Sequence, residues 1–249
     1  MDIQILQLET TSPDGTELKS YVCLPKDASA DKPAPAILVA PEWWGVVEFV
    51  QKVTERLARA GFAAVAMDVY GEGKLTTDAS QANEWMEQML ANQDQLMARC
   101  QAILKDFCDV QGVDSKRLGG IGFCFGGKIV LDMAREGLPL QAVATFHGNL
   151  TPKQPAEKGK FAAKVLVAHG EADTMTTMDD VAKFKTEMDQ ANVEYTVDVY
   201  EGAKHGFSNP AADERAAQND VDLGYDEAAA NASWDAMIAF MQNNLANAQ

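Results

Sequence analysis

The chain has 249 residues, of which 47% are hydrophobic and 23% charged, as in a globular protein with a sizeable core. Its 37 Asp and Glu residues outnumber its 21 Lys and Arg residues, which gives a formal net charge of −16. This charge argues against nucleic acid and anionic membranes as partners, because both bind basic surfaces. We expect a single α/β domain over residues 1–249, a monomer or weak homodimer, with a small molecule as its ligand.

Targeting segments and metal motifs are not evident. Residues 1–15 have neither the basic start nor the apolar run of a signal peptide, and no stretch of about 18 apolar residues indicates a transmembrane helix. The four cysteines have no CxxC spacing and no nearby histidine that would indicate zinc. We expect free thiols in a cytoplasmic protein that uses no metal and no other cofactor.

The first predicted elements are strands. Residues 3–10 and 17–25 flank the turn sequence SPDG and predict an antiparallel hairpin. Residues 36–40 form a continuous apolar run, which is typical of a strand that is covered on both faces.

From there, strands and helices alternate along the chain. Further strands are predicted at residues 62–70, 117–123, 141–148, 163–170 and 194–200. Helices are predicted at 49–60, at 78–110 as two helices broken near Asn92, and at 127–135, 181–190 and 225–245. The alternation predicts a mainly parallel central sheet with helices on both faces. We expect the Ala-rich, acidic segment 209–232 to be a mobile loop or a short helix.

The sequence GFCFGG at residues 122–127 places Cys124 between glycines, after a predicted strand and before a predicted helix. This G-x-C-x-G pattern is that of a nucleophile elbow with sulfur in place of the serine oxygen. The elbow needs small neighbours because its central residue has a strained backbone, and the amides at the start of the helix favour a thiolate. An inert cysteine buried at a glycine-rich turn is the alternative.

An elbow nucleophile needs an acid and then a histidine, in that order along the chain. Asp173 follows the predicted strand 163–170, and His205 follows the last predicted strand. Glu171 is the rival acid, although we favour Asp173. His169 is expected to have a structural role, with a bond to the acid loop.

Glu42 follows an apolar strand, where a carboxylate is unfavourable without a partner. It is either a glutamate of a surface loop or a group near Cys124 that shares its proton or holds it in place. The backbone amides of Trp43 and Phe125 are candidates for an oxyanion hole, since two convergent amides would stabilise a tetrahedral intermediate.

The ordered motifs PEWWG, GFCFGG, HGEAD and KHGF, spread over most of the chain, resemble those of the dienelactone hydrolase family. The resemblance implies an α/β-hydrolase fold and hydrolysis of an ester or lactone. It implies that Cys124 is the nucleophile, that His205 is base and then acid, and that Asp173 orients His205. It further implies that Glu42 interacts with the cysteine and that the oxyanion hole is made as described above.

Family members that act on dienelactone hold the substrate carboxylate with arginines near two of these motifs. This sequence has DVYGEGKLTT and HGFSNPAAD there, and the first arginine after His205 is Arg215. Lys74 is a possible substitute. We therefore predict a substrate other than dienelactone itself. Candidate pocket residues, each with core packing as its alternative, are Trp44, Tyr70, Trp85, His147 and Phe207.

Other functions are compatible with the same residues. The main alternative is a catalytically weak family relative that binds a small ligand, with Cys124 as a redox-sensitive thiol. A peptidase or a thioester hydrolase is a further possibility. Ester turnover together with thiol labelling would separate the first alternative from a hydrolase.

Overall fold

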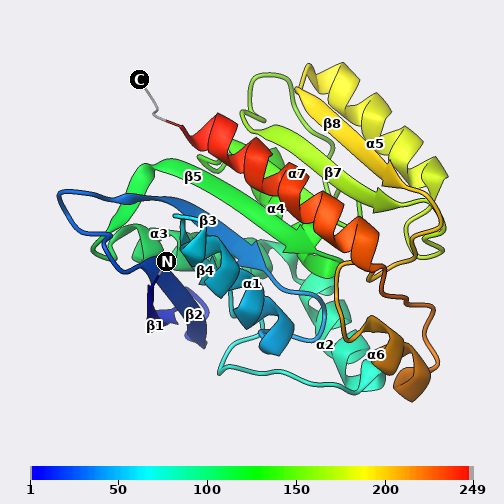
Figure 1. Ribbon diagram of the computed structural model, residues 1–249, viewed down its shortest axis with the longest axis horizontal. Helices are drawn as coiled ribbons and strands as arrows, with labels where there is room; N and C mark the ends of the chain where they lie inside the picture. Colours follow the sequence, from blue (N-terminus) through cyan, green and yellow to red (C-terminus); the bar gives the residue numbers. More distant parts are fainter. Residues whose placement is uncertain (1, 247–249) are drawn as a thin grey trace. The chain divides into compact units, whose positions relative to one another are not determined.

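The computed structural model describes residues 2–246, which fold as two compact units (Figure 1). The first unit comprises residues 2–120 together with 245 and 246, and the second comprises residues 121–244. Strand β5 (Val113–Phe123) begins in the first unit and ends in the second. Each unit is described by itself below.

The first unit is a sheet with the strand order β1-β2-β4-β3-β5. Its other strands are β1 (Ile3–Thr11), β2 (Glu17–Pro25), β3 (Ala34–Ala40) and β4 (Ala63–Ala66). The predicted hairpin is confirmed, since β1 and β2 pair antiparallel around the SPDG turn. Strands β3 and β4 are parallel, and β2 pairs antiparallel with β4.

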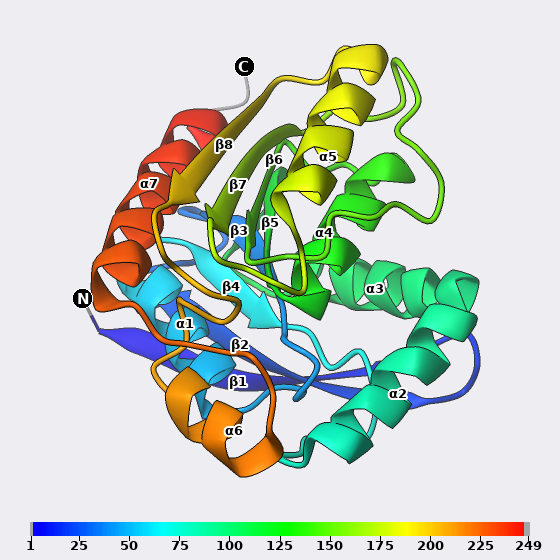
Figure 2. The ribbon, with the colours of Figure 1, turned by 90° about the vertical axis from the view of Figure 1, so that its right-hand side faces the viewer.

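Helices cover both faces of this first sheet. They are α1 (Glu48–Arg59), α2 (Ala79–Ala91) and α3 (Gln93–Cys108). Figure 2 shows α1 on one side of the strands and α3 on the other. This arrangement explains why β3 and β4 are almost entirely apolar, because both faces of each strand are buried.

Two sequence predictions in this unit had different outcomes. The break near Asn92 is confirmed, since α2 ends at Ala91 and α3 begins at Gln93. The strand predicted at 62–70 is too long, because β4 ends at Ala66. Beyond it, the carboxylate of Asp68 accepts hydrogen bonds from backbone amides that include those of Gly71 and Gly73, so side-chain bonding replaces the strand ladder.

The second unit continues from β5 with the strand order β5-β6-β7-β8. Its strands are β6 (Ala142–Phe146), β7 (Lys164–Gly170) and β8 (Tyr195–Tyr200), and the pairs β6–β7 and β7–β8 are parallel. Its helices are α4 (Phe125–Arg135), α5 (Met178–Ala191), α6 (Ala212–Asn219) and α7 (Glu227–Leu245).

Helices lie on both sides of this second sheet as well. Figure 2 shows α4 and α5 on one side of the strands and α7 on the other. The predicted, mainly parallel sheet flanked by helices is therefore confirmed. The segment for which we expected a loop or short helix contains α6 and the start of α7.

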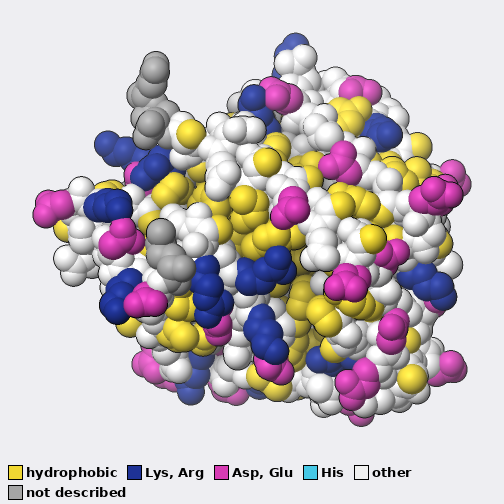
Figure 3. Space-filling model, viewed as in Figure 1, with side chains coloured by type: hydrophobic (Ala, Val, Ile, Leu, Met, Phe, Trp, Pro, Cys, Tyr) yellow, Lys and Arg dark blue, Asp and Glu magenta, His cyan; other side chains and the backbone are white. Residues whose placement is uncertain are grey.

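The surface agrees with the acidic composition. Acidic side chains are dispersed over the face shown in Figure 3. Among residues 2–246, every helix is too short or too polar to span a lipid bilayer.

A buried ion-pair network joins α4 to α5. The Asp132 carboxylate contacts the Lys128 ammonium at 2.9 Å and the Arg135 guanidinium at 2.9 Å, and Arg135 also contacts Glu187 at 2.8 Å. Arg135 further donates to the Leu150 carbonyl, so the network holds the loop after β6. Two positive and two negative groups balance, which is the condition under which buried charges are tolerated.

We predict that Asp132→Ala destabilises the protein by about 3–5 kcal/mol, because Lys128 and Arg135 would lose their shared anionic partner in a buried place. Urea unfolding followed by circular dichroism measures this loss. As a control, Asp2→Ala removes the exposed ion pair with Lys26 and should change the free energy of unfolding by less than about 1 kcal/mol. Equal effects of the two substitutions would contradict the role given to the network.

Candidate active site

Cys124 occupies a sharp turn between β5 and α4. Its backbone has φ 53° and ψ −115°, a conformation that a side-chain-bearing residue rarely adopts. The Cys124 amide donates to the Phe146 carbonyl at 3.1 Å, and the Cys124 carbonyl accepts from the amides of Gly127 (3.0 Å) and Asn149 (3.2 Å). Three backbone hydrogen bonds thus hold the strained residue, as an elbow requires.

Glycine is required at the residue two before the thiol. A Cβ atom on Gly122 would overlap the backbone carbonyl group of Gly126. The first turn of α4 therefore passes so close to the end of β5 that no side chain fits between them. This contact is the physical reason for the glycine spacing seen in the sequence.

The thiol of Cys124 is partly exposed. Cys124 is also the N-cap residue of α4, and its side chain makes no capping hydrogen bond. The sulfur therefore lies at the positive end of the helix dipole, where negative charge is favoured. A partly exposed sulfur in this electrostatic setting is suited to act as a nucleophile.

Asp173 lies in the loop after β7 and is buried. One carboxylate oxygen accepts the amide hydrogens of Met175 (2.8 Å) and Thr176 (2.9 Å), while the other lies 2.8 Å from Nδ1 of His205. The carboxylate is thus fixed by the backbone of its own loop, and its second oxygen can orient an imidazole.

His205 follows β8 and is also buried. Burial lowers the pKa of the ring, but the charge on Cys124 and the hydrogen bond to Asp173 outweigh it and raise the pKa of His205 to about 10. Nδ1 is engaged by Asp173, and the buried Nε2 has no hydrogen bond of regular geometry with residues 2–246. We therefore take the Cys124–His205 interaction to be mainly one of charge.

The structure thus brings together three of the residues singled out in the sequence: Cys124, Asp173 and His205. All three belong to the second unit and follow β5, β7 and β8. The rival acid Glu171 is exposed and accepts a hydrogen bond from the amide of Gly202 instead. This arrangement can form a thiolate–imidazolium pair that a carboxylate orients.

His147, predicted as a pocket residue, lies directly after β6 and beside His205, with ring centroids 5.0 Å apart. Its Nε2 lies 3.0 Å from the hydroxyl of Ser208. Sequence reasoning missed Ser208, for which the signal was its position three residues after His205. The bond expected between His169 and the acid loop is not formed, since neither ring nitrogen of His169 has a hydrogen-bond partner among residues 2–246.

The remaining predicted residues divide between the units. Phe125 is the first residue of α4, and Phe207 is fully buried against His147 at 5.5 Å. Both belong to the second unit, together with the three residues of the proposed triad. The role of the Phe125 amide in an oxyanion hole and the role of Phe207 in a substrate pocket stay predictions.

Five predicted residues lie in the first unit. Glu42 is buried directly after β3. The Tyr70 hydroxyl donates to the Trp43 carbonyl at 2.9 Å, and the Tyr70 and Trp85 rings are 5.4 Å apart. Trp44 is buried beside Trp43, with ring centroids 4.9 Å apart. Their roles toward Cys124 and a substrate stay predictions.

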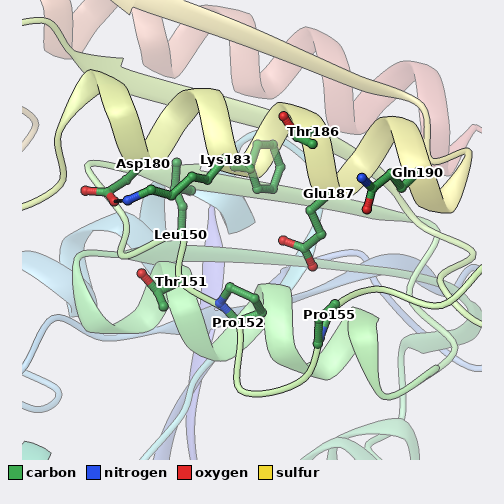
Figure 4. Close-up of a pocket in the computed structure, with 10 residues that line it drawn as sticks. Leu150, Thr151, Pro152, Pro155, Asp180, Lys183, Thr186, Glu187 and Gln190 are labelled. Carbon is green, nitrogen blue, oxygen red and sulfur yellow. Dashed lines mark hydrogen bonds and ion pairs between the residues drawn. The ribbon is translucent and has the colours of Figure 1, made fainter.

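A separate cavity of about 390 Å³ lies in the second unit between α5 and the loop after β6 (Figure 4). In Figure 4, Lys183 reaches Asp180 along α5, while Pro152 and Pro155 approach from the loop. None of the predicted site residues lines this cavity. Within residues 2–246, no group of three His, Cys, Asp or Glu side chains is placed to hold a metal ion.

Comparison with known proteins gives consistent matches. The model of the dienelactone hydrolase family matches residues 18–245. A provisionally named carboxymethylenebutenolidase of Yersinia pestis is 29% identical over 210 residues, covering 80% of this chain and 78% of the relative. Protein usf of Aquifex pyrophilus is 29% identical over 242 residues, covering 93% and 96%.

Solved structures agree with these matches. The dienelactone hydrolase-like promiscuous phosphotriesterase P91, from metagenomic libraries, has a TM-score of 0.90 and 28% identity over 98% of this chain and 99% of the other. A provisionally named dienelactone hydrolase from Klebsiella pneumoniae has a TM-score of 0.78 and 25% identity over 97% and 99%.

We predict that Cys124→Ala lowers the pKa of His205 well below its wild-type value, because the main charge that favours the imidazolium is removed. With three histidines in the chain, ring NMR can follow each one separately. The His147 and His169 signals can be told from that of His205, since burial lowers the pKa of both. An unchanged His205 titration in the variant would contradict the pairing of sulfur and ring.

The same shift predicts how protonation affects stability. The pKa of His205 is higher in the folded chain than the value of about 6.5 expected when unfolded. Protonation therefore stabilises the fold fully below about pH 6.5, and this contribution disappears as the pH rises through about 10.

Proposed function

The chain belongs to the dienelactone hydrolase family and is a hydrolase with an α/β-hydrolase fold, and we propose that it cleaves small esters or lactones with Cys124 as nucleophile. The family resemblance expected from the motifs is thereby confirmed. The nucleophile and the substrate class are our own inference from the site.

One observation carries the proposal. The nitrogen Nδ1 of His205 is 2.8 Å from the Asp173 carboxylate, while the same ring interacts electrostatically with a cysteine that has an elbow backbone. A buried structural cysteine would need neither the strained φ nor an oriented imidazole. The combination favours nucleophilic catalysis over the inert cysteine that the sequence left open.

In the proposed first step, the Cys124 sulfur attacks the carbonyl carbon of the substrate and forms the carbon–sulfur bond. The carbonyl electron pair moves to oxygen, where we propose that the amides of Phe125 and Trp43 stabilise it. The intermediate collapses as the carbon–oxygen bond to the leaving group breaks. His205 gives its proton to that oxygen, which leaves a thioester on Cys124 and a neutral imidazole.

In the second step, the neutral His205 takes a proton from water while the water oxygen attacks the thioester carbon. Collapse of this second intermediate breaks the carbon–sulfur bond and releases the carboxylic acid. The products are a Cys124 thiolate and a His205 imidazolium, which is the starting pair. Asp173 keeps Nδ1 of the ring toward itself throughout the cycle.

Glu42 is proposed to assist this cycle from the loop after β3. Its carboxylate is buried, and a buried carboxylate requires a partner. A role beside the cysteine would hold the sulfur or share its proton between turnovers. This assignment follows the family pattern.

The pairing of the two lysines that neighbour the family motifs in the sequence favours substrates without a carboxylate. Lys204, next to His205, is paired with Asp222 at 2.8 Å. Lys74, the possible substitute for the family arginines, is half exposed and pairs with Glu72 at 3.2 Å. A lysine already paired with a carboxylate offers less attraction to a second one.

The alternative, a weak relative with a redox-sensitive Cys124, is tested by the same thiol. It predicts rapid labelling by iodoacetamide and reversible oxidation without ester turnover. A hydrolase predicts labelling that abolishes turnover, with one label per active site.

We predict that Cys124→Ala lowers the turnover of p-nitrophenyl acetate by at least about 10³-fold, since removal of a nucleophile leaves only binding and oxyanion stabilisation. Release of nitrophenolate measures the rate. Cys108→Ala removes another partly exposed thiol outside the site and is expected to leave the rate unchanged. Activity of Cys124→Ala within a few-fold of wild type would refute the proposed nucleophile.

We also predict that the lactone bond is cleaved no faster in a lactone that carries a free carboxylate than in the same lactone with that carboxylate methylated. The physical reason is that Lys74 and Lys204 already have anionic partners. Ring opening followed by chromatography gives kcat/KM for both. A preference for the charged lactone of about tenfold or more, equivalent to about 1.4 kcal/mol, would overturn this prediction.

A further inference from the structure

We propose that His147 and Ser208 form a positioning pair that holds the His205 ring in its catalytic orientation, an inference that rests on the proposed function. The pair is defined by the 3.0 Å contact between Nε2 of His147 and the Ser208 hydroxyl. Neither residue lies within the four motifs that carry the family resemblance.

The backbone of His147 ties the strand ends of the site together. Its amide donates to the Ala168 carbonyl of β7 at 2.9 Å, and the carbonyl of the preceding Phe146 accepts the Cys124 amide. His147 has a positive φ of 38°, which is uncommon for a residue with a side chain. Strain of this kind persists where surrounding contacts fix it, and here they connect the elbow with the strand that leads to Asp173.

The His147 and His205 rings pack in a T-shaped arrangement, with centroids 5.0 Å apart and an interplanar angle of 66°. On another side it packs against Phe207 at 5.5 Å and 79°. Both rings are buried. The hydrogen bond that Nδ1 of His205 donates to Asp173 fixes one end of the ring, and we infer that the packed His147 ring restricts rotation about that bond.

Ser208 fixes the orientation of His147 in turn. Because Ser208 lies three residues after His205, its hydroxyl holds the packed ring to the same loop that carries the catalytic base. Loop and ring therefore move together, and displacement of one would displace the other.

The pair functions with an uncharged His147. Burial, and then the positive charge of His205, hold the pKa of His147 well below its usual range. The other titratable ring that faces it is His169, whose charge would act in the same direction. A neutral ring can pack against the His205 imidazolium without the repulsion that a second cation would add.

Ser208→Ala tests the pair without changing the strained backbone. We expect kcat for p-nitrophenyl acetate to fall about ten- to a hundredfold, with KM within about twofold, because a misplaced base affects the chemical step. Ser208→Thr keeps the hydroxyl and should restore most of the rate. Ser233→Ala removes a buried serine hydroxyl of α7 and is the matched control, with unchanged activity.

His147→Asn is the second variant, because asparagine tolerates positive φ but lacks the ring. In the double variant with Ser208→Ala, we expect no loss beyond that of the worse single variant, since the two residues act as one unit. Losses that multiply, or kcat within twofold of wild type in both single variants, would overturn the proposal. Thermal unfolding identifies any variant that fails to fold. If His147→Asn fails to fold, the result for Ser208→Ala decides the proposal.

NMR titration separates this proposal from the proposed function. In Ser208→Ala, the His205 ring should be held less firmly, and its interactions with Cys124 and Asp173 should weaken. The pKa of His205 should therefore fall from its wild-type value. This readout does not require ester turnover. If wild-type protein cleaves no ester, the proposed function fails while the titration still tests the pair, and an unchanged His205 pKa refutes the pair.

Discussion

Cys124 must keep φ 53° and ψ −115°, and much of the second unit follows from that constraint. The strained turn places Cys124 at the N-terminus of α4, but such a backbone is unstable without outside support. Support comes from the hydrogen bonds of Cys124 with Phe146, Gly127 and Asn149, which tie the elbow to the end of β6 and to the first turn of α4. The nucleophile is thus positioned by backbone contacts, which leaves its side chain available for chemistry.

Helix α4 then has to be held where the elbow places its first residue. The ion pairs of Lys128, Asp132 and Arg135 run along this helix, and Arg135 extends them to Glu187 on α5. Such groups contribute little net stability compared with apolar packing, but they demand specific partners. We infer that they fix the position of α4 relative to α5, and with it the position of the helix N-terminus behind the sulfur.

The parts of the site that depend on contacts between residues close in sequence could be predicted, whereas those that depend on distant loops could not. The elbow was readable because Gly122 and Cys124 are fixed by a turn of a few residues. The order of Asp173 and His205 was readable because each follows a strand of a parallel sheet. The pairing of His147 with Ser208 was not, since it joins loops 61 residues apart with no motif. The end of β4 was misjudged because the Asp68 carboxylate accepts hydrogen bonds from the amides of Gly71 and Gly73, which the apolar run of residues 62–70 does not indicate.

A formal charge of −16 opposes an anionic nucleophile if the charges act over long distances. Charges on a solvated surface are screened within about 8–10 Å at ordinary ionic strength, so most of this total acts weakly on a partly buried site. The groups that decide are the neighbours: the His205 imidazolium, the Asp173 carboxylate and the positive end of α4. The Asp173 carboxylate also accepts hydrogen bonds from two backbone amides, which share its negative charge. Asp173 therefore orients His205 without cancelling the effect of the imidazolium charge on Cys124.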